Sequence, residues 1–182
     1  MKLLACPKCH QQLHLENKTL KCENNHCYDI SKRGYINLLL NPDKATNNPG
    51  DSKESLVARK AYLNKGYYDP ILNQVITCID EFKHQDDLSI LDLGCGEGYY
   101  TQGLKKHFEN SDIYGLDISK IAIDMATRYR KDVTWLVGNS KNIPILDHSL
   151  DFICALFTVV NQDELKRALK EDGYLSLIHI SE

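Results

Sequence analysis

Short apolar runs alternate with amphipathic stretches from residue 88 to the end of the chain. The apolar runs predict buried strands over 88–93, 112–117, 133–137, 151–157 and 174–180. Helical spacing of apolar residues between them predicts helices over 101–108 and 119–130, and a third helix before Gly173. Strands that alternate with helices are typical of parallel sheets, so we predict an α/β fold with a doubly wound, mostly parallel, Rossmann-like sheet.

The first third of the chain has a different pattern. Leu13 and Leu15 alternate with His14 before a polar turn, which predicts a hairpin within a small zinc-ribbon-like module over residues 1–38. Prolines, asparagines and a glycine over 41–51 indicate a loop or linker.

Two helices are predicted between this linker and the first strand of the sheet. Asp51 and Glu54 resemble a capping box at the start of one helix, and Asp69 precedes Pro70 at the start of the next. We therefore divide the chain into a module over 1–38, a linker and helix over 39–70, and a core over 71–182.

Four of the seven cysteines lie in the first 27 residues. Cys6 and Cys9 form one short knuckle, and Cys22 begins a second that contains His26 and, next to it, Cys27. A hairpin between two such knuckles is typical of tetrahedral zinc sites. Four protein ligands leave no open position, so the predicted zinc is structural. The spacing leaves His26 and Cys27 as alternatives for the fourth ligand.

A glycine-rich loop follows the strand predicted over 88–93. Gly94, Gly96 and Gly98 lie between that strand and a helix, where open α/β sheets bind ligands. Asp117 ends the next strand, and its carboxylate is suited to ribose hydroxyls, although it could instead cap the following helix. The third glycine comes one residue too early for the dinucleotide pattern, which favours a ligand without a pyrophosphate, such as S-adenosylmethionine.

The composition indicates where in the cell the protein is expected and how its charge is distributed along the chain. The hydrophobic fraction of 42% is ordinary for a globular protein, no apolar run is long enough to span a membrane, and no secretory signal is visible, so we expect a cytoplasmic protein without a membrane partner. Residues 1–70 carry 11 Lys and Arg against 7 Asp and Glu, whereas the whole chain has a net charge of −3. A basic front is a candidate surface for an anionic partner, or an ordinary solvated face.

The glycine loop carries a family resemblance. "ILDLGCGEGYYT" resembles the first motif of class I S-adenosylmethionine-dependent methyltransferases, and "GLDIS" resembles their second. The resemblance implies that Asp117 holds the cofactor's ribose and that Asn139 lies near its adenine. It also implies that the loop residues cradle the cofactor, namely Gly94, Gly96, Glu97 and Gly98.

Further motifs narrow this resemblance. "CPKCHQQL", "SKRGYINLL" and "PGDSKESLVARKAYLNKGYY" are similar to segments of the RlmA-type 23S ribosomal RNA guanine-N1 methyltransferases, and the likeness runs from Cys6 to about Gly173. The resemblance implies methyl transfer to N1 of a guanine in a 23S ribosomal RNA hairpin, with Tyr68 contacting the cofactor. It implies four zinc ligands, and so favours His26 over Cys27: Cys6, Cys9, Cys22 and His26.

Two features depart from the family pattern. Phe157-Thr158-Val159 replaces the aromatic-Ala/Ser-Pro sequence that follows the fourth strand in family members and borders the methyl acceptor. Family members also continue past the fifth strand, so we expect this chain to be a C-terminally truncated fragment. Its ending, "LSLIHISE", resembles translated sequencing-adapter read-through, which calls the native origin of residues beyond about 175 into question.

The residues do not identify a catalytic base. His148 and Asp151 are near the expected site in sequence, but a surface turn and a strand start explain them better. A second copy of the chain is a candidate partner. Two alternatives to the RNA methyltransferase stay open: a zinc-dependent RNA-binding remnant without activity, and a methyltransferase that acts on a small molecule.

Overall fold

The computed structural model describes residues 1–40, 50–82 and 87–178 of the 182-residue chain. The linker predicted over 41–51 lies mostly outside these residues, as do the last two positions of the strand predicted over 174–180. In the described part of the chain, no helix combines the length and the apolar character needed to cross a membrane.

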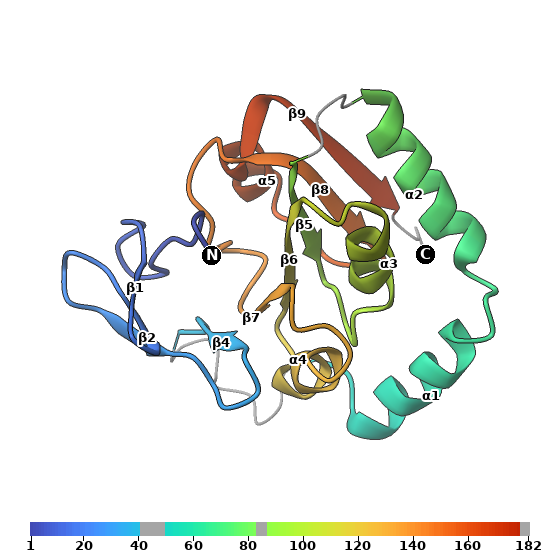
Figure 1. Cartoon of the computed structure of the whole chain (residues 1–182), viewed down its shortest axis with the longest axis horizontal. Coiled ribbons are helices and arrows are strands. Elements are labelled where there is room, and N and C mark those ends of the chain that lie inside the picture. The colour runs from blue at the N-terminus through green and yellow to red at the C-terminus, as the bar shows by residue number, and fades with distance from the viewer. Residues whose placement is uncertain (41–49, 83–86, 179–182) are drawn as a thin grey trace.

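A six-stranded sheet forms the centre of the molecule (Figure 1). Its order is β4-β7-β6-β5-β8-β9, and every neighbouring pair is parallel. The strands are β4 Ile36–Asn37, β5 Ser89–Leu93, β6 Asp112–Asp117, β7 Thr134–Val137, β8 Leu150–Leu156 and β9 Leu169–Ile178. The predicted α/β class and parallel Rossmann-like sheet are therefore confirmed.

Five helices accompany these strands in the described residues: α1 Lys53–Leu63, α2 Asp69–Phe82, α3 Tyr99–His107, α4 Lys120–Ala126 and α5 Gln162–Ala168. Helices α2, α3 and α4 supply Val75, Leu104 and Ile123 to one core, which packs on one face of the sheet. Alternate residues of the strands point to the opposite face, because side chains alternate along a strand.

The N-terminal module covers much of that opposite face. It is a three-stranded antiparallel sheet of β1 His14–Glu16, β2 Thr19–Lys21 and β3 Cys27–Asp29. Leu4 and Leu20 are fully buried and join a core that contains Leu91 of β5 and Leu116 of β6. In Figure 1 the blue module lies on one side of the large sheet, and α2 and α3 lie on the other.

The junction between module and sheet is hydrogen-bonded as well as apolar. Ala5 donates its backbone N–H to the Pro144 carbonyl at 3.0 Å, and Leu146 donates to the Leu3 carbonyl at 2.9 Å. The chain then leaves the module through β4, where Ile36 pairs with Leu136 of β7. The predicted boundary at residue 38 therefore follows a strand that already belongs to the large sheet.

Several element ends differ from the sequence prediction. Helix α1 is capped by Ser52, whose hydroxyl accepts from the Ser55 N–H at 3.1 Å, and not by Asp51. Helix α4 ends at Ala126, four residues before the predicted end. Strand β9 begins at Leu169 and includes Gly173, because its pairing with β8 shifts register between Leu150 and Phe152.

Candidate functional site

The glycine loop lies at the carboxyl end of β5, between that strand and α3. Gly94, Gly96 and Gly98 all have positive φ values, of 76°, 55° and 88°. Gly94 and Cys95 donate backbone N–H groups to the Leu116 carbonyl of β6, at 2.8 and 3.1 Å. A Cβ at position 98 would lie 2.6 Å from the Trp135 ring, so packing inside the protein requires that glycine.

Gly96 differs from its neighbours because the space beside it is open. An added Cβ would meet no atom within 4 Å. The Gly96 N–H donates to Asp117 Oδ2 at 2.9 Å, and the other oxygen, Oδ1, accepts from the Ser119 N–H at 2.7 Å. Burial raises the Asp117 pKa, while these two hydrogen bonds oppose the rise. A carboxylate oxygen has more than one lone pair, so Asp117 still has acceptor capacity for ribose hydroxyls.

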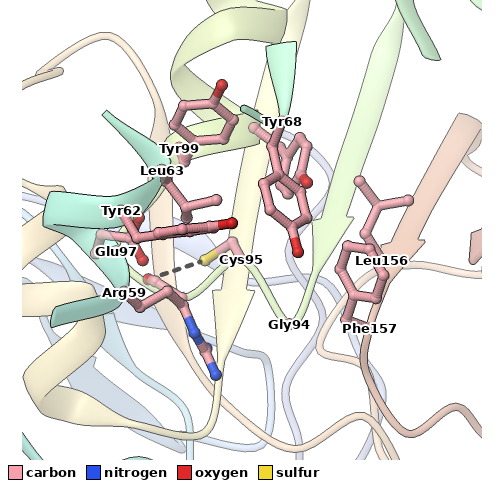
Figure 2. A pocket seen from close by; sticks show the side chains of 12 residues that line it. Arg59, Tyr62, Leu63, Tyr68, Gly94, Cys95, Glu97, Tyr99, Leu156 and Phe157 are labelled. Atoms are coloured by element: carbon pink, nitrogen blue, oxygen red, sulfur yellow. Dashed lines mark hydrogen bonds between the residues drawn. The ribbon is translucent and has the colours of Figure 1, made fainter. Parts of the chain in front are cut away.

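A cavity of about 250 Å³ opens beside this loop. It lies at the ends of β5 and β8, where the order of the sheet reverses, which is the usual ligand position in open parallel sheets. Helix α1 and the turn after it form the opposite wall (Figure 2). The lining residues are Arg59, Tyr62, Leu63, Tyr68, Gly94, Cys95, Gly96, Glu97, Tyr99, Tyr100, Leu156 and Phe157.

Aromatic rings dominate the mouth of the cavity. Tyr62 contacts Tyr68 with ring centroids 6.0 Å apart, and Tyr68 contacts Phe157 at the same separation. Tyr62 and Phe157 are nevertheless 50% and 42% exposed. Phe157 also has a φ of 58°, a left-handed conformation that costs a non-glycine residue about 1–2 kcal/mol.

Two side chains of opposite charge line the cavity, Glu97 and Arg59. Glu97 of the glycine loop is buried, and burial raises the pKa of its carboxyl. Arg59 of α1 also lines the cavity and lowers that pKa, and Figure 2 shows the two side chains on the same side of the cavity. The Arg59 guanidinium also pairs with Asp51 at 2.7 Å.

The structure brings most of the predicted cofactor residues together. Four of them line the cavity: Tyr68, Gly94, Gly96 and Glu97. Asp117 accepts a hydrogen bond from the Gly96 N–H of the loop. Gly98 lies at the start of α3 but does not line the cavity. Asn139 follows β7 at the same edge of the sheet, where its side chain accepts from the Lys141 N–H at 3.0 Å, and it too lies outside the cavity lining.

The two residues considered as bases lie at the other edge of the sheet. Asp151 Oδ2 accepts from the Ser89 N–H at 3.0 Å, and Lys170 donates to Asp151 Oδ1 at 2.9 Å. Asp151 starts β8 and Ser89 starts β5, so both lie at the amino ends of their strands. Asp151 and His148 therefore have the structural roles that the sequence favoured.

Part of the cavity lining was not predicted from the sequence. Tyr62 and Leu63 come from the last turn of α1, and no motif marked that helix as a wall of the site. Tyr99 and Tyr100 follow the glycine loop directly, and this position in the chain is the sequence signal that points to them.

The cysteine cluster is compact. Cys6 Sγ and Cys22 Sγ each lie 3.4 Å from His26 Nδ1, and Cys9 Sγ lies 3.5 Å from it. All four ligand atoms are within 4.8 Å of one another. Tetrahedral zinc with ordinary bond lengths separates its ligand atoms by about 3.5–3.8 Å, so the cluster fits a structural zinc ion. Cys27 is exposed and lies outside the cluster, with its thiol directed to the Asn25 carbonyl.

Comparisons with known proteins agree with this geometry. A family model described as "RlmA, N-terminal", a zinc ribbon, matches residues 4–45, and a model described as "Methyltransferase domain" matches residues 90–173. The chain is therefore similar to an RlmA-type zinc ribbon in its first part and to a methyltransferase domain in its second. The RlmA-type ribbon therefore comprises the three-stranded module and its cysteine cluster, and the methyltransferase domain contains the glycine loop.

Relatives match this chain over both the ribbon and the methyltransferase domain. A Streptomyces fradiae protein named 23S rRNA (guanine(748)-N(1))-methyltransferase is 28% identical over 98% of this chain and 63% of its own length. A Bacillus subtilis protein provisionally named a 23S rRNA (guanine-N(1)-)-methyltransferase is 31% identical over 95% of this chain and 62% of its own length. The chain thus spans less than two thirds of the length of these relatives.

The fold also has a solved counterpart. The crystal structure of a candidate S-adenosyl-L-methionine-dependent methyltransferase from Methanococcus maripaludis matches with a TM-score of 0.59 and 22% identity. The match covers 72% of this chain and 65% of that one. The open space at Gly96 and the acceptor capacity of Asp117 fit S-adenosylmethionine as the cofactor of this chain.

Proposed function

We propose that this chain is the zinc- and cofactor-binding part of an enzyme that methylates N1 of a guanine in 23S ribosomal RNA. The observation that carries the proposal is the presence in one chain of a ribbon similar to the RlmA type and a methyltransferase domain, with the ribbon packed into a core of the large sheet. The names of the Streptomyces and Bacillus relatives support the choice of reaction and substrate. Such a substrate implies a cytoplasmic location.

The zinc ion belongs to the ribbon in this proposal. Cys6, Cys9, Cys22 and His26 would hold it, and the compactness of the cluster supports this assignment. Four protein ligands leave zinc no open position for a substrate, so its contribution is to folding. The zinc would thereby fix the face that the ribbon presents to the sheet.

The cofactor would lie along the carboxyl edge of the sheet. Glu97 and the three glycines would hold it at the loop, Asp117 would bind its ribose, Asn139 would lie beside its adenine, and Tyr68 would contact it from the α1–α2 turn. When bound, S-adenosylmethionine supplies an electrophilic methyl group on a sulfonium. The protein's contribution is to hold the acceptor nitrogen in line with that methyl group, and such positioning lowers a barrier by several kcal/mol.

The acceptor base must leave its helix to reach the cavity. N1 lies on the Watson–Crick edge, so the guanine has to be unpaired or flipped out, which favours a hairpin loop as the target. Lys8, Lys18 and Lys32 are exposed on the ribbon and would grip phosphates. Arg33 and Lys60 are less suited to that role, because Arg33 pairs with Asp124 and Lys60 lies over the Tyr129 ring.

The test is transfer of a labelled methyl group from S-adenosylmethionine to ribosomal RNA, followed by mapping of the modified nucleotide. The proposal expects one N1-methylguanine in 23S ribosomal RNA and binding that weakens steeply with salt. Cofactor binding without any RNA methylation would favour a methyltransferase that acts on a small molecule. RNA binding without cofactor binding would favour a non-catalytic adaptor.

The hairpin target and the participation of a second copy of the chain are each tested by a separate measurement. An isolated stem–loop that contains the mapped guanine should be methylated, whereas the same sequence held in a full duplex should not. Sedimentation of the chain with and without that stem–loop tests whether a second copy takes part.

A further inference from the structure

One hydroxyl of the ribbon contacts a zinc ligand of the proposed site. Tyr28 lies in the middle of β3, and its Oη atom is 3.4 Å from Cys6 Sγ. Strand β3 pairs with β2 so that Tyr28 is opposite Leu20, which is fully buried. Side chains alternate along a strand, so the exposed neighbours Cys27 and Asp29 point away while the Tyr28 ring packs on the core. The register of these strands therefore places the hydroxyl at the cluster.

Zinc binding fixes the direction of this hydrogen bond. Without a metal, either the thiol or the hydroxyl can be the donor. A cysteine that ligates zinc is a thiolate, which has no proton to donate, whereas a phenol keeps its proton at neutral pH. In the zinc-loaded chain the Tyr28 hydroxyl is therefore the donor, and the Cys6 sulfur is the acceptor.

The Cys6 sulfur needs a donor because it is buried. Three cysteine thiolates bring one more negative charge than a zinc dication neutralises. Cys6 is fully buried and belongs to the apolar core that joins the ribbon to the large sheet. Charge in such surroundings is destabilising unless hydrogen bonds compensate it. The Tyr28 hydroxyl supplies one of these hydrogen bonds.

We propose that Tyr28 is a positioning residue of the zinc site, whose hydroxyl donates to the Cys6 thiolate, strengthens zinc binding and makes that sulfur less nucleophilic. The inference rests on the zinc assignment in the proposed function and not on the identity of the methyl acceptor. Hydrogen bonds to a metal ligand fix its orientation and are worth about 10–100-fold in metal affinity. A thiolate that accepts a hydrogen bond also reacts more slowly with electrophiles, because the donor stabilises the electron pair that attacks. Tyr28 thereby keeps Cys6 on the metal.

Cys6 is also the ligand whose neighbours in the chain hold the ribbon on the sheet. Ala5 donates its N–H to the Pro144 carbonyl at 3.0 Å, and the Pro7 carbonyl accepts from the Asn142 side chain at 2.9 Å. Both partners lie in the segment that connects β7 to β8. A hydrogen bond that keeps Cys6 on zinc therefore also stabilises the junction between the ribbon and the methyltransferase domain.

The experiment compares the full chain as wild type, Tyr28→Phe and Tyr35→Phe, loaded with zinc or with cobalt(II) in its place. Tyr28→Phe removes the hydroxyl and keeps the ring, so the packing of β3 on the core is retained. Tyr35→Phe is the matched control, because Tyr35 is a buried tyrosine near the end of the same module that packs in the other core, with Val75. Cobalt(II) is the probe because it accepts the same tetrahedral ligands, and its thiolate-to-metal charge-transfer band reports the electron density on sulfur.

We expect Tyr28→Phe to weaken zinc binding about tenfold in competition with a chromophoric chelator, and Tyr35→Phe to stay within about twofold of wild type. Alkylation with N-ethylmaleimide should release zinc several-fold faster from Tyr28→Phe. In the cobalt form of that variant, the charge-transfer band should move to longer wavelength, because a sulfur without its hydrogen bond gives up electrons more easily. The d–d bands should keep their tetrahedral pattern.

Wild-type zinc affinity in Tyr28→Phe would overturn the inference. Weaker affinity with an unmoved charge-transfer band would overturn it as well, because the effect would then come from the packing of the ring and not from the hydrogen bond. A wild-type chain that binds neither metal fails at an earlier step and overturns the zinc assignment itself. A chain that binds zinc as expected but methylates no RNA overturns the proposed reaction and leaves the role of Tyr28 standing.

Discussion

The side-chain amide of Asn142 donates a hydrogen bond of 2.9 Å to the backbone carbonyl of Pro7. Pro7 lies between Cys6 and Cys9 in the first knuckle, and Asn142 lies in the segment that connects β7 to β8. The Asn142 N–H in turn donates to the Asn139 carbonyl at 3.1 Å. One residue therefore links the first cysteine knuckle to the segment that carries a proposed adenine-side residue.

Replacing Asn142 with alanine should lower the free energy of unfolding by about 1 kcal/mol, because the Pro7 carbonyl loses its donor. Thermal unfolding at fixed zinc concentration measures the effect. Asn73→Ala, at an exposed position of α2, should stay within about 0.5 kcal/mol of wild type. Equal effects of the two substitutions would show that the hydrogen bond between Asn142 and Pro7 contributes nothing measurable to the free energy of unfolding.

Removal of zinc should destabilise the whole chain and not only the ribbon. The ligands Cys6 and Cys22 belong to the same core as Leu91 and Leu116, so the cofactor domain loses a covering layer when the ribbon unfolds. Chelation, or Cys9→Ser, should lower the melting temperature of the sheet and weaken RNA binding, and both can be followed with zinc content. Cys27→Ser is the matched control because its thiol lies outside the cluster. A Cys9→Ser protein with normal melting and normal RNA binding would contradict this reading.

Gly96→Ala should abolish cofactor binding beyond its effect on stability. The added Cβ projects into the open space beside the loop, and a φ of 55° costs alanine about 1–2 kcal/mol. Gly34→Ala is the control, since Gly34 has a φ of 95° and its Cβ would also meet no atom within 4 Å. Both variants should lose similar stability, and only Gly96→Ala should lose calorimetric binding of S-adenosylmethionine. Parallel losses of binding in the two variants would leave backbone strain as the whole explanation.

Asp117→Asn should weaken cofactor binding by at least about tenfold. An amide has one acceptor oxygen, so it cannot accept from the N–H groups of both Gly96 and Ser119 as the carboxylate does. Asp112→Asn changes the exposed opposite end of the same strand and should bind the cofactor as wild type does. Titration calorimetry separates the two, and wild-type affinity in Asp117→Asn would remove Asp117 from the site.

Stability should depend on pH through Asp92. This carboxyl is fully buried in β5, accepts a hydrogen bond of 2.5 Å from the Thr101 hydroxyl, and has its pKa raised by burial from 3.8 to about 7. The folded protein holds the proton more tightly than the unfolded chain. The contribution of this bound proton to the free energy of unfolding is therefore fully present below pH 3.8, and it is lost as the pH rises through about 7.

Asp92→Asn should remove this component, because the amide does not titrate. The difference in unfolding free energy between wild type and variant should change by a few kcal/mol between about pH 4 and pH 7, in the direction that favours the variant at higher pH. Urea titrations across that range measure it. A difference that does not vary with pH would mean that Asp92 is ionised throughout.

The sequence by itself determined the sheet, the cysteine cluster and the glycine loop. These features depend on local spacing: apolar runs set the strands, and the two knuckles and the hairpin between them set the cluster. The loop and Asp117 follow consecutive parallel strands, whose carboxyl ends meet at one edge. The short-range pattern therefore located both candidate sites before any contact was known.

Only the tertiary structure decided how these parts meet. The periodicity of the sequence does not predict that Leu4 and Leu20 of the ribbon cover the face of the sheet opposite α2 and α3. It also does not predict that Tyr62 from α1 lies beside the glycine loop. Pairings between residues far apart in the chain leave no spacing in the sequence. The contact between the Tyr28 hydroxyl and Cys6 Sγ is of the same kind, because the two residues lie 22 positions apart and meet only in the folded ribbon.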